Sequence, residues 1–273
     1  KDFSISRLSN KMPWGVPVPG DEDHVMYVWF DALVNYISTL GWPKDDENFE
    51  AYWPGVQLAG KDNLRQQAAM WQAMLASAGL PFSEKILING FISVDGQKMS
   101  KSLGNVISPT EMVDRYGTEA TRFLLMELGP FGTDMDVTWE KLDTSYTALL
   151  SNGVGNVCSR IAKMCEKNGS EFNIHEVEVP EAYTAALTKY DIATAIKLIN
   201  EYVSDIDVYL SETQPWKKSG DDQTAILQTA VERVRTMATM LLPVMPGISQ
   251  SISDLFTQTQ ISALEPLFPR LPK

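Results

Sequence analysis

The first half of the chain alternates short apolar runs with longer amphipathic stretches. Three runs rich in aliphatic, β-branched or aromatic residues predict strands, at residues 25–30, 56–59 and 86–88. Two stretches with apolar residues at helical spacing separate them, at residues 31–40 and 62–78. Gly79 and Pro81 mark the end of the second helix. Strands that alternate with helices are typical of a parallel sheet with crossover helices, so we expect an α/β domain over residues 1–138.

The second half carries the pattern of long helices only. Apolar residues recur every three or four positions in three stretches, at residues 144–168, 181–213 and 223–242. A shorter helix is expected after Pro246, and Gly129-Pro130-Phe131-Gly132 breaks the pattern between the two halves. The sequence therefore predicts an α-helical bundle over residues 139–258, followed by an irregular tail over residues 259–273.

The segment Lys98-Met99-Ser100-Lys101-Ser102 lies between the last predicted strand and the bundle. Asp95-Gly96 before it is a turn signal, and Ser108-Pro109-Thr110-Glu111 after it is typical of a capped helix start. The segment is therefore predicted to be a loop held between ordered elements, with two ammonium groups three residues apart. Such a loop can bring two cations to a polyphosphate; the alternative is a solvated loop without a ligand.

Composition sets limits on the class of protein. The chain has 273 residues and a net charge of −12, which counts against broad, nonspecific binding of nucleic acid and confines any basic surface to one face. Cys158 and Cys165 are seven residues apart on one predicted helix, a rise of about 10 Å that is too long for a disulfide. Two free thiols favour a reducing, cytoplasmic setting. His24 and His175 lie far from them in sequence, so no zinc site is expected, and no apolar run is long enough to span a membrane.

The loop and its surroundings resemble the methionyl branch of the class I aminoacyl-tRNA synthetases. The resemblance is carried by NGFISVDGQKMSKSLGNVISPTEMVDRYGTEATRFLLM at 89–126, DFSISR at 2–7, WGVPVPGD at 14–21, YVWFDALVNYI at 27–37, GKDN at 60–63, PW at 215–216 and LLPVMP at 241–246. These segments keep the family's order and spacing along the chain. The resemblance implies a methionine–tRNA ligase, which uses ATP and its associated Mg²⁺ to activate methionine and then transfers it to tRNA(Met).

The resemblance also implies the residues of a nucleotide and methionine site. Catalytic roles fall to Lys98 and Lys101, which would stabilise charge on the departing pyrophosphate, and to Arg7. The ATP-binding set is Gly60, Asp62, Lys98, Met99, Ser100, Lys101 and Ser102, and the methionine-binding set is Trp29, Tyr36, Asp62, Gln67 and Trp71. An aromatic, polarisable cleft suits a thioether, although each aromatic residue taken alone is better explained as part of the core. Asp62 would receive the α-amino group; the alternative is a simple helix cap.

Three residues of the predicted bundle match family positions that read the anticodon. Asn156 and Arg160 are one helical turn apart, and Trp216 follows Pro215 beyond the end of a helix. A base stacked on that indole would contribute about 1–3 kcal/mol to binding. The alternative is an ordinary solvated helix face.

The chain also departs from the family pattern. Gln67 stands where many members have a histidine, Gln66 replaces an aromatic residue, and Asp207 stands where asparagine is usual. The family's HIGH motif and zinc-bearing insert have no counterpart. We therefore expect the C-terminal half of a synthetase, unable to form the adenylate alone, with the N-terminal half as its partner. The alternatives are a catalytically silent tRNA-binding protein, or a synthetase of the same subclass for cysteine, isoleucine, leucine or valine.

Overall fold

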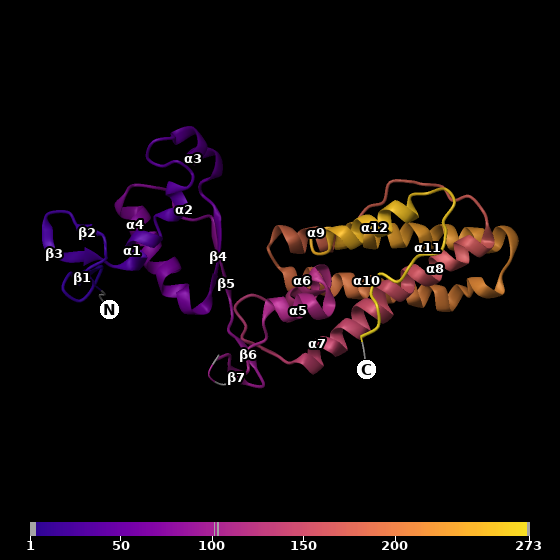
Figure 1. The fold of residues 1–273 in the computed structure, drawn as a ribbon. Coiled ribbons are helices and arrows are strands. Elements are labelled where there is room, and N and C mark those ends of the chain that lie inside the picture. Colours follow the sequence, from indigo (N-terminus) through magenta and orange to yellow (C-terminus); the bar gives the residue numbers. More distant parts are fainter. Residues whose placement is uncertain (1–3, 101, 103, 272–273) are drawn as a thin grey trace. The chain divides into compact units, whose positions relative to one another are not determined.

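The computed structural model describes residues 4–100, 102 and 104–271. The chain divides into two compact units, which we describe separately (Figure 1). The first unit comprises the residues up to Phe91 together with Phe131–Thr133, and the second comprises Ile92–Pro130 together with the residues from Asp134 onward. The expected domain boundary at residues 138 and 139 is not tested by this division and stays a prediction.

The first unit contains the predicted parallel pairing. Strand β4 (Val56–Gly60) pairs in parallel with β5 (Lys85–Asn89), with Val56 opposite Lys85 and Gly60 opposite Asn89. The connection between them is helical, as expected, and is built from η1 (Lys61–Asn63), the π-helical segment η2 (Gln66–Trp71) and α4 (Gln72–Ser77). Gly79 follows α4 with a φ of +70°, which confirms the predicted glycine stop.

The expected strand over residues 25–30 is wrong in its extent and its partners. Strand β3 (Asp21–Met26) ends earlier and lies in a small antiparallel sheet, between β1 (Ser6–Leu8) and β2 (Pro17–Val18). The aromatic run that follows begins the short helix α1 (Val28–Ala32), and α2 (Asn35–Ser38) takes the rest of the expected helix. Trp29 and Phe30 gain contacts with the apolar core in this helical geometry, and such packing overrides the weak preference of aromatic residues for strands.

The core of the first unit gathers aromatic and aliphatic residues from these helices and from α3 (Asp46–Tyr52). Its buried members are Leu33, Ile37, Phe49, Trp53, Met70, Trp71 and Leu75. Trp53 and Trp71 meet edge to face, with ring centroids 6.1 Å apart. This core therefore supports η2, which carries two of the predicted methionine-binding residues, Gln67 and Trp71.

The second unit opens with the strands that flank, in sequence, the segment Lys98-Met99-Ser100-Lys101-Ser102, which we call the lysine loop. Strands β6 (Ile92–Val94), β7 (Gln97–Lys98) and β8 (Met135–Val137) form one sheet in the order β7-β6-β8. The turn between β6 and β7 has positive φ at Asp95 and Gly96, as the turn signal predicts. Helices α5 (Pro109–Tyr116) and α6 (Thr118–Glu127) follow, and the predicted capping box at the start of α5 is present.

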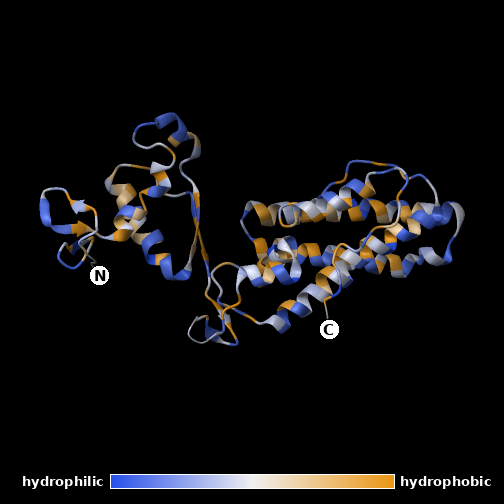
Figure 2. Cartoon of the chain, viewed as in Figure 1, coloured by the Kyte–Doolittle hydropathy of each residue, from blue (hydrophilic) through white to orange (hydrophobic). Residues whose placement is uncertain are grey.

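The rest of the second unit is the predicted bundle. Its segments are α7 (Trp139–Ser145), the π-helical η4 (Tyr146–Gly155), α8 (Asn156–Asn168), α9 (Glu181–Thr188), α10 (Ile192–Thr213), η5 (Pro215–Lys217), α11 (Gly220–Leu241) and α12 (Pro246–Phe256). The expected single helix over residues 181–213 is wrong, because Tyr190 has a φ of +59° and Asp191 caps a new helix. Hydrophilic and hydrophobic residues alternate along these helices, and the apolar ones form one large core (Figure 2). A small parallel sheet with crossover helices followed by a helical bundle confirms the predicted fold class.

Candidate functional site

The structure brings together three of the five residues predicted to bind methionine. The Nε2 of Gln67 donates to the Tyr36 hydroxyl at 2.8 Å, and the rings of Tyr36 and Trp71 have centroids 6.0 Å apart. Gln67 and Trp71 are almost fully buried, at 2% and 1% exposure. Yet neither Gln67 Oε1 nor Trp71 Nε1 has a hydrogen-bond partner among the described residues. Buried polar atoms are rarely left unpaired, so this cluster has one acceptor and one donor available to a ligand or water.

The other two members of that set also lie in the first unit. Trp29 is half-buried and packs against the same apolar core. Asp62 is exposed and lies within η1, immediately beyond the carboxyl end of β4. The residue that precedes η1 is Gly60, and no side chain caps that helix, so the interpretation of Asp62 as a simple cap gains no support. A Cβ atom at Gly60 would lie 2.8 Å from Asp62 Oδ1, so a larger residue at this position would require the carboxylate to shift.

Arg7 lies in β1 with its guanidinium stacked on an aromatic ring. Its Cζ is 4.1 Å from the centroid of Tyr27, and its Nη1 donates to the backbone oxygens of Ser4 and Ser6. It lines a cavity of about 180 Å³ together with Arg65 and other residues, namely Ser4, Tyr27, Gln66 and Met70. The sequence did not single out Tyr27 or Arg65, because neither role is visible before the strand and the helix are brought together.

The lysine loop begins in the second unit as a strand and continues as a hydrogen-bonded turn. Lys98 is exposed at the end of β7, opposite Ser93 in β6, and Met99 packs against the bundle core. The backbone N–H of Ser100 donates to Asn105 Oδ1 at 2.8 Å, and Asn105 Nδ2 donates to the backbone oxygen of Lys98. The hydroxyls of Ser100 and Ser102 share a hydrogen bond of 2.7 Å. Lys101 lies outside the described residues.

Asp136 in β8 holds the hairpin that carries Lys98. Its Oδ1 accepts from the backbone N–H of Gly96 at 2.6 Å and from the Ser93 hydroxyl at 2.8 Å, and its Oδ2 pairs with Lys141 Nζ at 2.9 Å. These donors, the Gly96 N–H foremost, lower the pKa of Asp136 to about 2. Asp136 and Asn105 are thus structural supports of the loop that motif matching does not single out.

Two of the three residues predicted to read the anticodon lie together in the bundle. Arg160 on α8 donates from Nη1 to Asp207 Oδ1 on α10 at 2.7 Å, and its Cζ is 5.9 Å from the ring centroid of Trp216 in η5. The Trp216 side chain is 49% exposed. Asn156 is exposed at the first position of α8, one helical turn before Arg160. Indole, guanidinium and amide are the groups that stack on a base and hydrogen-bond to its edge.

Other classes of site find little support in the part of the chain that the structure describes. No group of three or more His, Cys, Asp or Glu side chains is arranged to hold a metal ion there. Cys158 and Cys165 are free and buried, and burial raises the pKa of the Cys165 thiol to about 12. Among the described helices, none combines the length and the apolar character that crossing a membrane requires.

Comparisons with known proteins agree with these features. The family model described as tRNA synthetases class I (M) matches residues 1–162, and that of the anticodon-binding domain of tRNA ligase matches residues 177–273. The chain is 38% identical over 271 residues to the methionine–tRNA ligase of Thermotoga maritima, covering 92% of this chain and 43% of that protein. It is 35% identical to the enzyme of Brucella melitensis, covering 99% of this chain and 59% of that protein.

A solved structure of methionyl-tRNA synthetase from Mycobacterium tuberculosis in complex with methionyl-adenylate superposes with a TM-score of 0.83 at 34% identity. The match covers 99% of this chain and 60% of that one. The chain thus spans about half the length of the curated relatives it matches. Since the first family model alone matches more than half of the chain, the chain belongs to the class I tRNA synthetase family of the methionyl type.

Proposed function

We propose that this chain supplies the methionine pocket, the lysine loop and the tRNA-binding bundle of a methionine–tRNA ligase. The observation that carries the proposal is the cluster of Tyr36, Gln67 and Trp71, in which two buried polar atoms have no partner among the described residues. Aromatic rings offer a thioether favourable sulfur contacts, and the unpaired amide and indole atoms can orient a bound amino acid. Asp62 would pair with the α-amino group of methionine.

The reaction proposed is attack of the methionine carboxylate on the α-phosphorus of ATP, with release of pyrophosphate. Acceleration of such a step depends on positioning and on charge stabilisation. Lys98 and Lys101 would take up charge on the pyrophosphate, while Arg7 and Gly60 would border the nucleotide. Mg²⁺ would accompany the ATP phosphates. The methionyl group would then pass to tRNA(Met), whose anticodon Asn156, Arg160 and Trp216 would bind.

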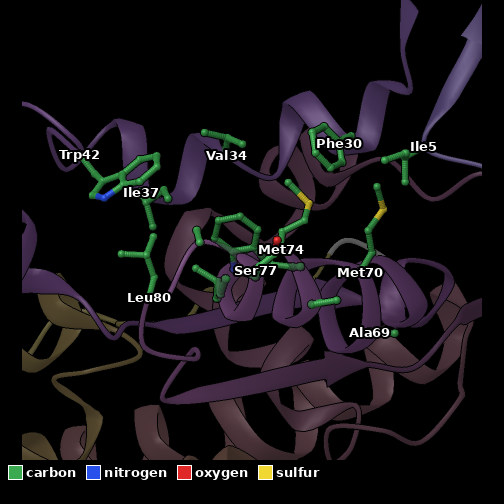
Figure 3. A pocket seen from close by; sticks show the side chains of 14 residues that line it. Ile5, Phe30, Val34, Ile37, Trp42, Ala69, Met70, Met74, Ser77 and Leu80 are labelled. Atoms are coloured by element: carbon green, nitrogen blue, oxygen red, sulfur yellow. The ribbon is translucent and has the colours of Figure 1, made fainter. Parts of the chain in front are cut away.

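The first unit also has apolar surface that a further part of a synthetase would cover. A groove of about 660 Å³ runs between α1 and the η2–α4 helix, with Phe30 and Val34 facing Met70 and Met74 across it (Figure 3). On β4, Leu58 is 62% exposed, although strands of parallel sheets are usually covered on both faces. We propose that the N-terminal half of the synthetase covers these surfaces.

The reducing, cytoplasmic location expected from the two free thiols also stays a proposal.

The test is methionine-dependent exchange of pyrophosphate into ATP, measured with and without an added N-terminal half. We expect exchange only when both halves are present, and a fall of about 10²–10³ in the Lys98→Ala or Lys101→Ala variants, as for the loss of one transition-state donor. A mixture of folded halves that shows no exchange would instead favour the catalytically silent tRNA-binding protein.

The proposed tRNA contact can be tested on this chain alone. A short RNA hairpin with a CAU loop should bind the chain, and Trp216→Ala should weaken that binding by about 1–3 kcal/mol. Trp14→Ala is a matched control, because Trp14 is 78% exposed and lies in the other unit. Equal affinity of the two variants would contradict a role of Trp216 in stacking.

A further inference from the structure

The guanidinium of Arg160 is held between a carboxylate and an indole. Its Nη1 donates to Asp207 Oδ1 at 2.7 Å, and its Cζ lies 5.9 Å from the ring centroid of Trp216. The side chains of Arg160 and Asp207 are each 38% exposed, so a ligand can reach the pair from solvent. Three helical elements, α8, α10 and η5, thus contribute one residue each to a small exposed cluster.

The backbone around Trp216 is fixed independently of that ion pair. Gln214 ends α10 in the left-handed region with a φ of +47°, Pro215 is buried, and Gln223 Nε2 on α11 donates to the Pro215 carbonyl at 2.9 Å. The indole is therefore presented from a rigid turn. Arg160, in contrast, has a long side chain with many rotamers, and Asp207 accepts the only hydrogen bond recorded for its guanidinium among the described residues.

We propose that Asp207 is a positioning residue that makes the Arg160–Trp216 pair selective for one base of an RNA loop. This inference rests on the proposed function, in which this surface binds the anticodon loop of tRNA. A guanidinium has five N–H donors, so four stay available to a base edge after one is given to Asp207. Their direction is set by the ion pair, and a base stacked on Trp216 meets them in one orientation only.

Asp207 also lowers the attraction of this surface for phosphate in general. Without the carboxylate, the Arg160 charge is free to neutralise any backbone phosphate, as the exposed Lys163 and Lys217 already can. Loss of Asp207 should therefore leave total RNA affinity similar or higher while it reduces discrimination between loops. A residue that merely supports the fold would lower the affinity for all RNAs alike.

The experiment measures affinities of the whole chain for two RNA hairpins that differ only in the loop triplet, CAU or a scrambled triplet, at several salt concentrations. For Asp207→Ala, which removes the acceptor of Arg160 Nη1, we expect the ratio of the two affinities to fall about 3- to 10-fold, the scale of one side chain losing its preorganised rotamer. The slope of log affinity against log salt concentration should steepen by about 0.7, the contribution of one additional phosphate contact. Asp207→Glu, which keeps a carboxylate, should restore most of the ratio.

Asp205→Ala is the matched control, since Asp205 is an exposed neighbour on α10 whose substitution removes the same charge. It should leave the ratio unchanged. In the Arg160→Gln background, Asp207→Ala should change the ratio no further, which tests the pair even if one single variant is unstable. If Asp207→Ala keeps the wild-type ratio, the inference is overturned although the proposed function stands. If the wild-type chain does not distinguish the hairpins, the proposed function of this surface fails, and the inference falls with it.

Discussion

The hydrogen bond between Tyr36 and Gln67 allows a direct test of the candidate methionine pocket as a structural unit. In Tyr36→Phe the ring stays in place but the acceptor of Gln67 Nε2 is lost. Because Gln67 is 2% exposed, its Nε2 would then be a buried donor without the acceptor that it has now. A buried donor left unpaired costs about 1–3 kcal/mol, so we expect the free energy of unfolding to fall by about that amount.

The converse substitution, Gln67→Met, should cost less. It removes the whole amide, including the Oε1 that has no partner among the described residues, and leaves only the hydroxyl of Tyr36, a residue that is half-buried rather than buried. The double variant should then be more stable than the sum of the two single changes implies, by about 1 kcal/mol. Such a coupling would show that the amide and the hydroxyl act on one another rather than independently on the core.

The assay is urea denaturation followed by tryptophan fluorescence. This probe reports mainly on the first unit, which holds most of the seven tryptophans, namely Trp14, Trp29, Trp42, Trp53 and Trp71. Tyr52→Phe is the control, since Tyr52 is 67% exposed and loses the same hydroxyl to solvent. If Tyr36→Phe were as stable as Tyr52→Phe, the buried hydrogen bond would not have the role assigned to it.

Three further predictions concern the second unit. The Glu119 carboxylate accepts hydrogen bonds from two backbone N–H groups in the first turn of α12, at 2.5 and 2.6 Å. Glu119→Ala should therefore lower the free energy of unfolding by about 1–2 kcal/mol, and Glu119→Gln should lower it by less. Denaturation followed by circular dichroism measures both changes. The pKa of Asp136 is lowered to about 2, so its stabilisation of the hairpin should be complete above about pH 4 and should be lost as the pH falls to 2. Protection of the Gly96 amide from hydrogen exchange should show the same pH dependence, and this pH dependence should be absent in Asp136→Asn. Cys158 and Cys165 should resist iodoacetamide at pH 8 in the folded chain and react in denaturant, as measured by mass spectrometry, because burial raises the pKa of both thiols.

Features with strong local chemistry could be predicted from the sequence. The capping box at Ser108 and Glu111 depends only on residues within one turn, and the glycine stop at Gly79 depends on its own backbone freedom. The parallel pair β4–β5 followed from two apolar runs separated by a helical stretch. The cap and the glycine stop are determined by residues within one helical turn. The parallel pair follows from the general rule that strands joined through a helix lie parallel.

Features set by packing could not be predicted in the same way. Apolar spacing continues on both sides of Tyr190, so periodicity alone did not reveal the break between α9 and α10. The aromatic run after β3 satisfies strand preference locally but packs better as a helix on the core. Similarly, the motif identified Arg160 and Trp216, but only the structure pairs Arg160 with Asp207, 47 residues away on another helix.

The most direct test of the proposed activity is the amino-acid dependence of ATP–pyrophosphate exchange by this chain combined with an N-terminal half. Methionine should support exchange, and cysteine, isoleucine, leucine and valine should support little, since a pocket lined by Tyr36 and Trp71 favours a long, polarisable thioether. Exchange that proceeds equally well with isoleucine or leucine, or that ignores the amino acid added, would contradict the assignment of these residues to methionine.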